Sequence, residues 1–252
     1  MPLPAADWVA VPLGAGQEPL RCWWSRPDGE PPRAAVLVLP EVFGVNGWVR
    51  SVADRLALAG YGALAVPLFH HTAPTLELGY SEAELRLGRS HKERTSAAQL
   101  LADLAAAVTW LDQQVGPGPI GCVGFCFGGH VAMLAATLPQ VRVTCACYGA
   151  GVVSGRPGGG PPTVAVVPQI GGHLLCLYGN QDPLIPPADV EAVQRALEAA
   201  GPGRHRLRVL NGGHGFLCDA RADHDPAAAQ EGWREIMAWL ERVLGPATAA
   251  GA

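Results

Sequence analysis

The sequence contains no cysteine pair of the C-x-x-C type, no long apolar run and no excess of basic residues. Seven cysteines is an odd number, which argues against a disulfide framework and indicates a reduced, cytoplasmic protein. No apolar run reaches the length needed to span a bilayer, and residues 1–7 lack the basic and apolar regions of a secretory signal. A net charge of −4 gives no indication of nucleic acid or an anionic membrane as a partner.

Two further signatures are missing. No cluster of side chains has metal-ligand spacing, and no glycine-rich loop ends in Gly-Lys-Ser/Thr, so we expect neither a metal nor a cofactor. Hydrophobic residues make up 49% of the 252 positions and charged residues only 16%, which is ample for a packed core. Because no internal repeat or linker divides the chain, we expect a single domain over residues 1–252, with residues 245–252 as a frayed tail.

Short apolar runs alternate with segments of helical periodicity along the chain. This alternation predicts an α/β protein with a mostly parallel, doubly wound sheet and helices on both faces. The first two strands are expected to form an antiparallel hairpin at the sheet edge. The stretch 68–90 is expected to be a functional loop, and 149–172 an exposed, variable one. We expect strands at residues 8–13, 20–25, 34–39, 62–66, 119–123, 141–148, 173–178 and 204–210, and helices at 49–59, 94–115, 131–138, 188–200 and 230–244.

One motif stands between an expected strand (119–123) and an expected helix (131–138). Gly124-x-Cys126-x-Gly128 has the spacing of a nucleophile elbow, with Cys where Ser is usual. A side chain two residues to either side of such a sharp turn would collide with neighbouring backbone, so glycine is needed there. The helix that follows would direct its N–H groups at the thiol, which favours the thiolate and offers a donor to an oxyanion. The alternative interpretation is a buried cysteine in a glycine-rich turn.

Two later residues turn this motif into a candidate catalytic triad. Asp182 and His214 each follow an expected strand, where reactive groups of a parallel sheet gather. Nucleophile, acid and histidine in this chain order are typical of the α/β-hydrolase fold. The thiolate would attack an acyl carbon, the imidazole would move the proton, and the carboxylate would hold the imidazole. Taken singly, Asp182 is also a common turn residue and His214 one of eight histidines.

At these residues the sequence resembles the dienelactone hydrolases, over about residues 34–244. The resemblance implies an α/β hydrolase with a Cys–His–Asp triad that acts on lactones or activated esters of small molecules. It also implies that Glu41 contacts the resting thiol, and that the backbone N–H groups of Val42 and Phe127 form the oxyanion hole. The matching segments are residues 40–46 (PEVFGVN), 124–129 (GFCFGG), 178–182 (YGNQD) and 214–216 (HGF).

The chain departs from this family at the substrate carboxylate clamp. By alignment, the two clamp arginines are replaced by Thr72 and Cys218. Arg86, Arg89 and Arg221 are near in sequence, but the sequence does not place them in the pocket. A carboxylate in a partly dry pocket needs a fixed cation. The sequence therefore predicts a preference for neutral esters or lactones.

Other features leave alternatives open. His70, His71 and Cys218 are candidates to line the substrate pocket, although they could equally be loop or packing residues. The same scaffold could serve a general carboxylesterase or thioesterase, or a binding protein without turnover. Redox chemistry at Cys126 is disfavoured because the elbow has no resolving cysteine. We expect a monomer or small homo-oligomer.

Overall fold

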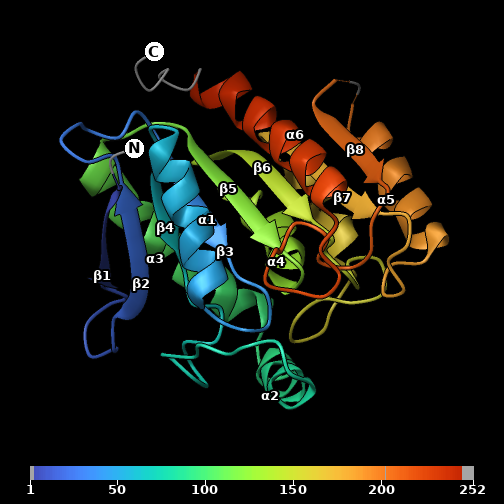
Figure 1. Cartoon of the computed structure of the whole chain (residues 1–252), viewed down its shortest axis with the longest axis horizontal. Coiled ribbons are helices and arrows are strands. Elements are labelled where there is room, and N and C mark those ends of the chain that lie inside the picture. The colour runs from blue at the N-terminus through green and yellow to red at the C-terminus, as the bar shows by residue number, and fades with distance from the viewer. Residues whose placement is uncertain (1–2, 202, 246–252) are drawn as a thin grey trace.

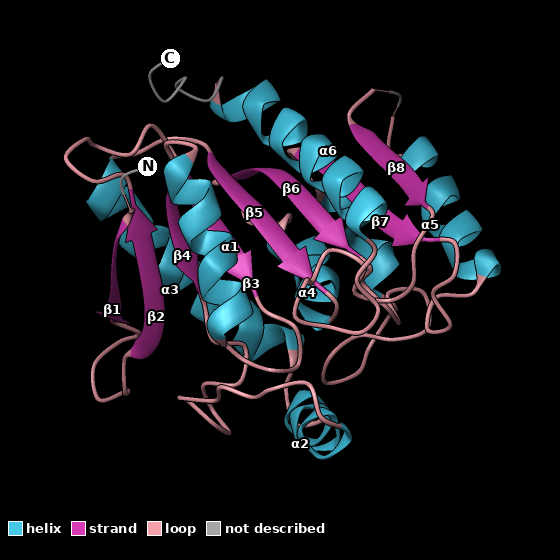
Figure 2. Ribbon diagram, in the orientation of Figure 1, coloured by secondary structure: helices cyan, strands magenta, loops and turns pink. Residues whose placement is uncertain are grey.

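The computed structural model describes residues 3–201 and 203–245, and within them eight strands form one sheet in the order β1-β2-β4-β3-β5-β6-β7-β8 (Figures 1 and 2). β1 and β2 form an antiparallel hairpin, β2 is antiparallel to β4, and β3 to β8 run parallel. The predicted mostly parallel sheet with an edge hairpin is confirmed. The strands are β1 (Ala5–Val11), β2 (Leu20–Arg26), β3 (Ala35–Leu39), β4 (Gly62–Ala65), β5 (Ile120–Phe125), β6 (Val141–Cys147), β7 (His173–Gly179) and β8 (His205–Leu210).

Helices cover both faces of the sheet. In Figure 1, α1 and α6 lie in front of the sheet, and α3 and α4 lie behind it. On the rear side the 3₁₀ helix η1 (Thr163–Gln169) contacts both α4 and α5. No helix in the described part of the chain is long and apolar enough to cross a membrane. The helices are α1 (Gly47–Leu58), α2 (Glu82–Lys92), α3 (Ala97–Val115), α4 (Phe127–Ala135), α5 (Pro187–Ala199) and α6 (Pro226–Leu244).

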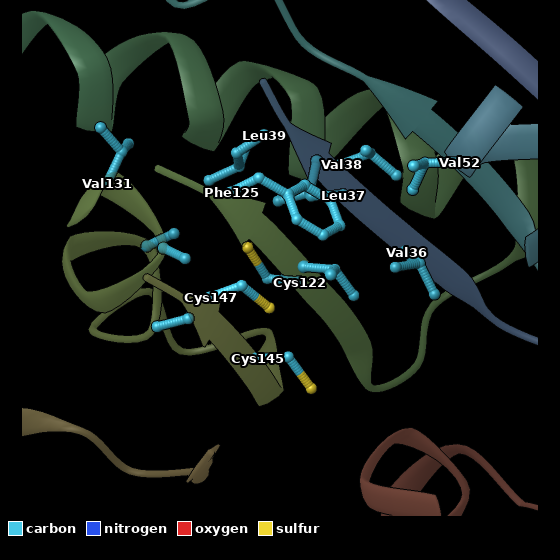
Figure 3. Packing of buried hydrophobic residues seen from close by; sticks show 14 of the residues in the cluster. Val36, Leu37, Val38, Leu39, Val52, Cys122, Phe125, Val131, Cys145 and Cys147 are labelled. Atoms are coloured by element: carbon cyan, nitrogen blue, oxygen red, sulfur yellow. The ribbon is translucent and has the colours of Figure 1, made fainter. Parts of the chain in front are cut away.

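The central strands β3 and β5 are buried at every position, as expected of parallel strands that carry helices on both faces. Val52 of α1 lies near Phe125 and the β3 valines, while Cys122, Cys145 and Cys147 lie among the strands (Figure 3). These three thiols are buried and free. They contribute as small apolar groups to the packing that holds the sheet rigid.

The helix predicted over 94–115 is confirmed as α3, although it begins three residues later, at Ala97. The stretch 68–90 is not a loop throughout, because a further helix, α2, begins within it at Glu82. Ser81 and Glu84 form a reciprocal capping box that starts α2, and Ser96 caps α3 by accepting the N–H of Gln99. The polar composition of α2 hid its helical character, because a helix at the surface need not carry a wide apolar stripe.

Two other boundaries differ from the sequence-based expectation. The helix predicted from residue 131 begins at Phe127, immediately after Cys126. The stretch 149–172 is not wholly exposed, because it contains η1, whose Val166 and Val167 are buried. Most of the predicted tail, residues 246–252, lies outside the described residues.

Four loops follow the carboxyl ends of parallel strands and meet at one edge of the sheet. Glu41 comes two residues after β3, Cys126 directly after β5, Asp182 three residues after β7 and His214 four residues after β8. This edge is where ligands bind in open α/β sheets. The topology therefore gathers all four residues at one place.

Candidate active site

Cys126 occupies the strained turn that the glycine spacing predicted. Its backbone has φ 53° and ψ −115°, in the positive-φ region that non-glycine residues rarely adopt. A Cβ at Gly124 would come within 2.0 Å of the Gly128 carbonyl oxygen, and one at Gly128 within 2.1 Å of the Leu39 carbonyl oxygen. Any side chain at either position would force the backbone apart, so the two glycines allow the turn.

Exposure separates Cys126 from the other cysteines. The other six are buried, whereas Cys126 is partly exposed and faces a cavity. Helix α4 begins at the next residue, so its unpaired N–H groups and positive dipole end lie beside the thiol. Its exposure and its place at a helix N-terminus make Cys126 the cysteine best placed to act as a nucleophile.

Asp182 and His214 form a buried hydrogen-bonded pair. The imidazole Nδ1 of His214 donates to Oδ2 of Asp182 over 2.8 Å, and the Leu184 N–H donates to Oδ1 over 2.8 Å. Burial is the largest single influence and lowers the pKa of His214. The negative charge of Cys126 and the hydrogen bond to Asp182 together outweigh it and raise the pKa to about 10. The imidazole Nε2 is buried and makes no standard hydrogen bond within the described residues. It therefore remains available to exchange a proton with the thiol or with a substrate.

The two loops that carry this pair are fastened to each other. Gly179 approaches so closely that a Cβ would lie 2.2 Å from the Gly212 carbonyl oxygen, and the Gln181 N–H donates to that oxygen over 2.9 Å. On the other side of the imidazole, the buried ring of Tyr148 lies edge-on, 5.3 Å from the His214 ring. The position and orientation of His214 are thus restricted by backbone and aromatic contacts.

Glu41 is buried beside the site and pairs with an arginine that the sequence could not place. Nη1 of Arg221 lies 2.8 Å from Oε1 of Glu41, and Nη2 lies 3.0 Å from Oδ2 of Asp223. Burial raises the pKa of Glu41, although Arg221 and His214 counteract part of this effect. The other oxygen, Oε2, has no hydrogen-bond partner among the described residues.

A cavity of about 310 Å³, here called the Cys126 pocket, brings these groups together. Of the three arginines that the sequence left unplaced, Arg89 and Arg221 line this pocket, together with Lys92. Arg89 and Lys92 belong to α2, a helix that the sequence interpretation missed, and neither makes an ion pair with another described residue. The lining residues are Val42, Phe43, Leu85, Arg89, Lys92, Cys126, Phe127, Ala150, Gly151, Leu184, His214 and Arg221.

Three predicted pocket residues lie elsewhere. His70 is buried, with its ring 5.1 Å from that of His71. His71 contacts the buried carboxylate of Asp103 over 3.1 Å. Cys218 is buried and its thiol donates to the Tyr80 hydroxyl over 3.4 Å. None of the three lines the Cys126 pocket.

The two residues predicted to form the oxyanion hole lie at the Cys126 pocket. Val42 and Phe127 both line the Cys126 pocket, one after β3 and the other at the start of α4. Gly88 of α2 packs against Val42, since a Cβ at Gly88 would lie 2.1 Å from the Val42 carbonyl oxygen. Within residues 3–201 and 203–245, no group of three or more His, Cys, Asp or Glu side chains could hold a metal ion.

Known proteins that this chain resembles are named as hydrolases of lactones or as dienelactone hydrolases. A Synechocystis protein named "Putative carboxymethylenebutenolidase" is 35% identical over 96% of this chain and 93% of its own length. A Bradyrhizobium protein named "Probable 2-oxo-3-(5-oxofuran-2-ylidene)propanoate lactonase" is 29% identical over 94% of each chain. The crystal structure of a "Putative Dienelactone Hydrolase" from Klebsiella pneumoniae matches with a TM-score of 0.84 and 28% identity, over 95% of this chain and 99% of that one.

More distant structures share the architecture alone. The Pyrococcus furiosus esterase Pf2001 matches with a TM-score of 0.69 at 17% identity, which shows the α/β-hydrolase fold. The family model described as "Dienelactone hydrolase family" matches residues 20–244, which is most of the chain. The chain is therefore an enzyme of the hydrolase class, and it belongs to the dienelactone hydrolase family.

Proposed function

We propose that this hydrolase cleaves a lactone or an activated ester of a small molecule through an acyl-enzyme on Cys126. His214 moves the proton and Asp182 holds His214. The observation that carries the proposal is the 2.8 Å bond between His214 Nδ1 and Asp182, which leaves Nε2 unbonded in the pocket that contains the one partly exposed thiol. This arrangement supplies a nucleophile, a base and an orienting acid in one cavity.

In the first step, the Cys126 thiolate attacks the ester carbonyl carbon and a C–S bond forms. Negative charge develops on the carbonyl oxygen, and the backbone N–H groups of Val42 and Phe127 stabilise it. The tetrahedral adduct collapses as the C–O bond to the leaving group breaks. The protonated Nε2 of His214 gives its proton to the leaving oxygen; in a lactone that oxygen remains attached to the acyl chain.

In the second step, water attacks the thioester while neutral His214 takes its proton. The C–S bond then breaks, the carboxylic acid leaves, and the proton on His214 re-forms the imidazolium beside the thiolate. The raised pKa of His214 favours that ion pair in the resting enzyme. Asp182 keeps the imidazole in the tautomer that both steps need.

Glu41 has a modulating role in this proposal. Its carboxylate neutralises Arg221, a cation that would otherwise face the thiolate from the pocket wall. Burial lowers the pKa of Arg221, but the negative charges of Glu41 and then of Cys126 raise it above its ordinary value. This effect places Arg221 and Cys126 within electrostatic reach of each other. Movement of Glu41 away from Arg221 would increase the positive potential at the thiol and favour attack.

The charge of the pocket revises the substrate preference predicted from sequence. Arg89 and Lys92 have no ion-pair partner among the described residues, so they are free to meet a carboxylate on the substrate. We therefore expect a free acid to be accepted at least as well as its methyl ester. The apolar walls from Phe43, Leu85 and Leu184 favour a second candidate in the same class, a carboxylesterase or thioesterase for open-chain acyl groups.

Turnover of a chromogenic short-chain ester tests the proposal. Cys126→Ala should abolish turnover while the protein stays folded, and Cys22→Ala serves as a matched control because that thiol is buried in β2. Turnover that survives in Cys126→Ala would contradict the triad. A wild-type protein that binds esters without cleaving them would favour a binding role. Comparing kcat/KM for a lactone and for an open-chain thioester then separates the two hydrolase candidates.

A further inference from the structure

A second cavity adjoins the Cys126 pocket and has no role in the chemistry described so far. Its volume is about 310 Å³, and we call it the distal cavity. It shares Lys92, Phe127, Ala150 and Gly151 with the Cys126 pocket, so the two cavities are neighbours. Its remaining lining residues are Glu93, His130, Ser154, Gly155, Arg156, Pro157 and Gly158.

The cations of the distal cavity are not neutralised by the protein. Arg156 is half-buried, and its Nε is buried without a hydrogen-bond partner among the described residues. Neither Arg156 nor Lys92 makes an ion pair with a described residue, although the acidic Glu93 lines the same cavity. Because Arg156 lines the cavity without an ion-pair partner, a ligand carboxylate there would gain a charge-assisted contact that no described protein group makes.

The pKa of His130, which lines the distal cavity, is affected by the cations around it. Its pKa is lowered to about 4: burial is the main cause, and Lys92 and Arg156 lower it further against the effect of the Ala150 carbonyl. The imidazole is held on both sides, by the Ala150 carbonyl oxygen at 2.9 Å and by the Thr163 hydroxyl at 2.7 Å. His130 is therefore a neutral structural group. The positive charges of the cavity are those of Lys92 and Arg156, and Glu93 contributes one negative charge.

The loop that carries Arg156 is fixed rather than loose. The Gly159 N–H donates to the Arg156 carbonyl oxygen over 2.9 Å, and the Thr163 N–H donates to the Gly155 carbonyl oxygen over 3.0 Å. The loop is also bound to the start of α3, because the Ala97 N–H donates to the Pro157 carbonyl oxygen over 2.8 Å. Arg156 is thus presented to the distal cavity from a defined position.

We propose that the distal cavity binds a carboxylate at the far end of the substrate's acyl chain, so that this enzyme hydrolyses monoesters of longer dicarboxylic acids. This inference rests on the proposed function at Cys126. The acyl arm is assigned to the cavity because it stays attached to Cys126 through both steps, whereas the alcohol must leave. A carboxylate anchored by Arg156 and Lys92 would hold the acyl group in place for attack and for hydrolysis.

The kinetic test uses p-nitrophenyl monoesters of dicarboxylic acids, from the four-carbon to the eight-carbon acid, each paired with its methyl-capped diester. The ratio of kcat/KM for acid over capped ester should rise with chain length. Arg156→Gln should lower the ratio for the longest pair about tenfold or more, because one charge-assisted contact is lost. Arg156→Lys should keep most of it, and the exposed Arg86→Gln should leave the ratios unchanged. A flat series, or a ratio that Arg156→Gln does not change, would overturn the proposal.

Binding provides a second test that needs no turnover. Lys92 is the only lysine in the sequence, so an amine reagent such as trinitrobenzenesulfonate modifies one side chain besides the N-terminal amine. In Cys126→Ala, suberate should slow the modification of Lys92, measured by peptide mapping, and leave the N-terminal amine unaffected. Arg156→Gln should remove this protection. Absence of protection would contradict the anion site even if Cys126 proves to be the nucleophile, whereas turnover without Cys126 would contradict only the proposed chemistry.

Discussion

Replacing Asp182 by Asn tests the tautomer argument with little change in shape. Asp182 accepts two hydrogen bonds, from His214 Nδ1 and from the Leu184 N–H, each at 2.8 Å. An amide can keep the Leu184 bond through its oxygen, but its NH₂ group then faces Nδ1. The imidazole is driven to carry its proton on Nε2, where it cannot act as a base. We expect kcat to fall by roughly a thousandfold or more.

The same substitution has two other measurable effects. Loss of the charge-assisted bond should lower the free energy of unfolding by about 1.5–3 kcal/mol, or the melting temperature by roughly 3–12 °C. The carboxylate also raises the pKa of His214, so its removal lowers that pKa and destabilises the imidazolium that accompanies the thiolate. Alkylation of Cys126 by iodoacetamide at neutral pH should therefore slow. In the wild type, the ion pair of the Cys126 thiolate and the His214 imidazolium should persist as the pH rises until His214 deprotonates, near pH 10.

The assays are steady-state turnover of a chromogenic ester, thermal unfolding, and the pH profile of alkylation. Asp223→Asn is the matched control: this carboxylate contacts Arg221 at the surface and is half exposed. A folded Asp182→Asn enzyme with near wild-type kcat would refute the role of Asp182. So would an unchanged alkylation profile, because it would show that the carboxylate does not support the imidazolium.

Three further predictions concern neighbouring residues. Glu41→Gln should speed alkylation of Cys126 about threefold to tenfold, because the charge of Arg221 is no longer neutralised; equal rates in competing labelling would remove the modulating role. Gly128→Ala should cost about 3 kcal/mol or more of stability in chemical denaturation, since its Cβ would lie 2.1 Å from a carbonyl oxygen; a wild-type midpoint would contradict the packing argument. Arg89→Gln should lower kcat/KM for a free-acid ester about tenfold relative to its methyl ester, and an unchanged ratio would show that this arginine does not meet the carboxylate.

Local chemistry made part of the site predictable from sequence. The elbow around Cys126 depends on glycines two residues away on either side, so its geometry is encoded within five residues. The positions of Asp182 and His214 after parallel strands followed from strand order, since the carboxyl ends of such strands share one edge. The Asp182–His214 contact is found where that argument placed it.

The rest of the pocket depends on contacts distant in sequence. Arg221 reaches Glu41 across 180 residues, and no periodicity or spacing indicates such a pairing. Arg89 and Lys92 enter the pocket only because α2 is a helix, and the capping box at Ser81 was the signal that could have located it. His70 was mistaken for a pocket residue because its burial depends on tertiary packing, which the local sequence does not indicate.

The acyl-enzyme is the central claim, and rapid-quench mass spectrometry tests it most directly. Wild-type enzyme is mixed with an activated ester, quenched in acid within the first turnovers, digested and mapped. The mechanism predicts a mass increase equal to one acyl group on the peptide that contains Cys126, and a longer-lived adduct when His214 is replaced by Ala and water is no longer activated. An acyl group on any other residue, or turnover with no covalent adduct in either protein, would contradict it.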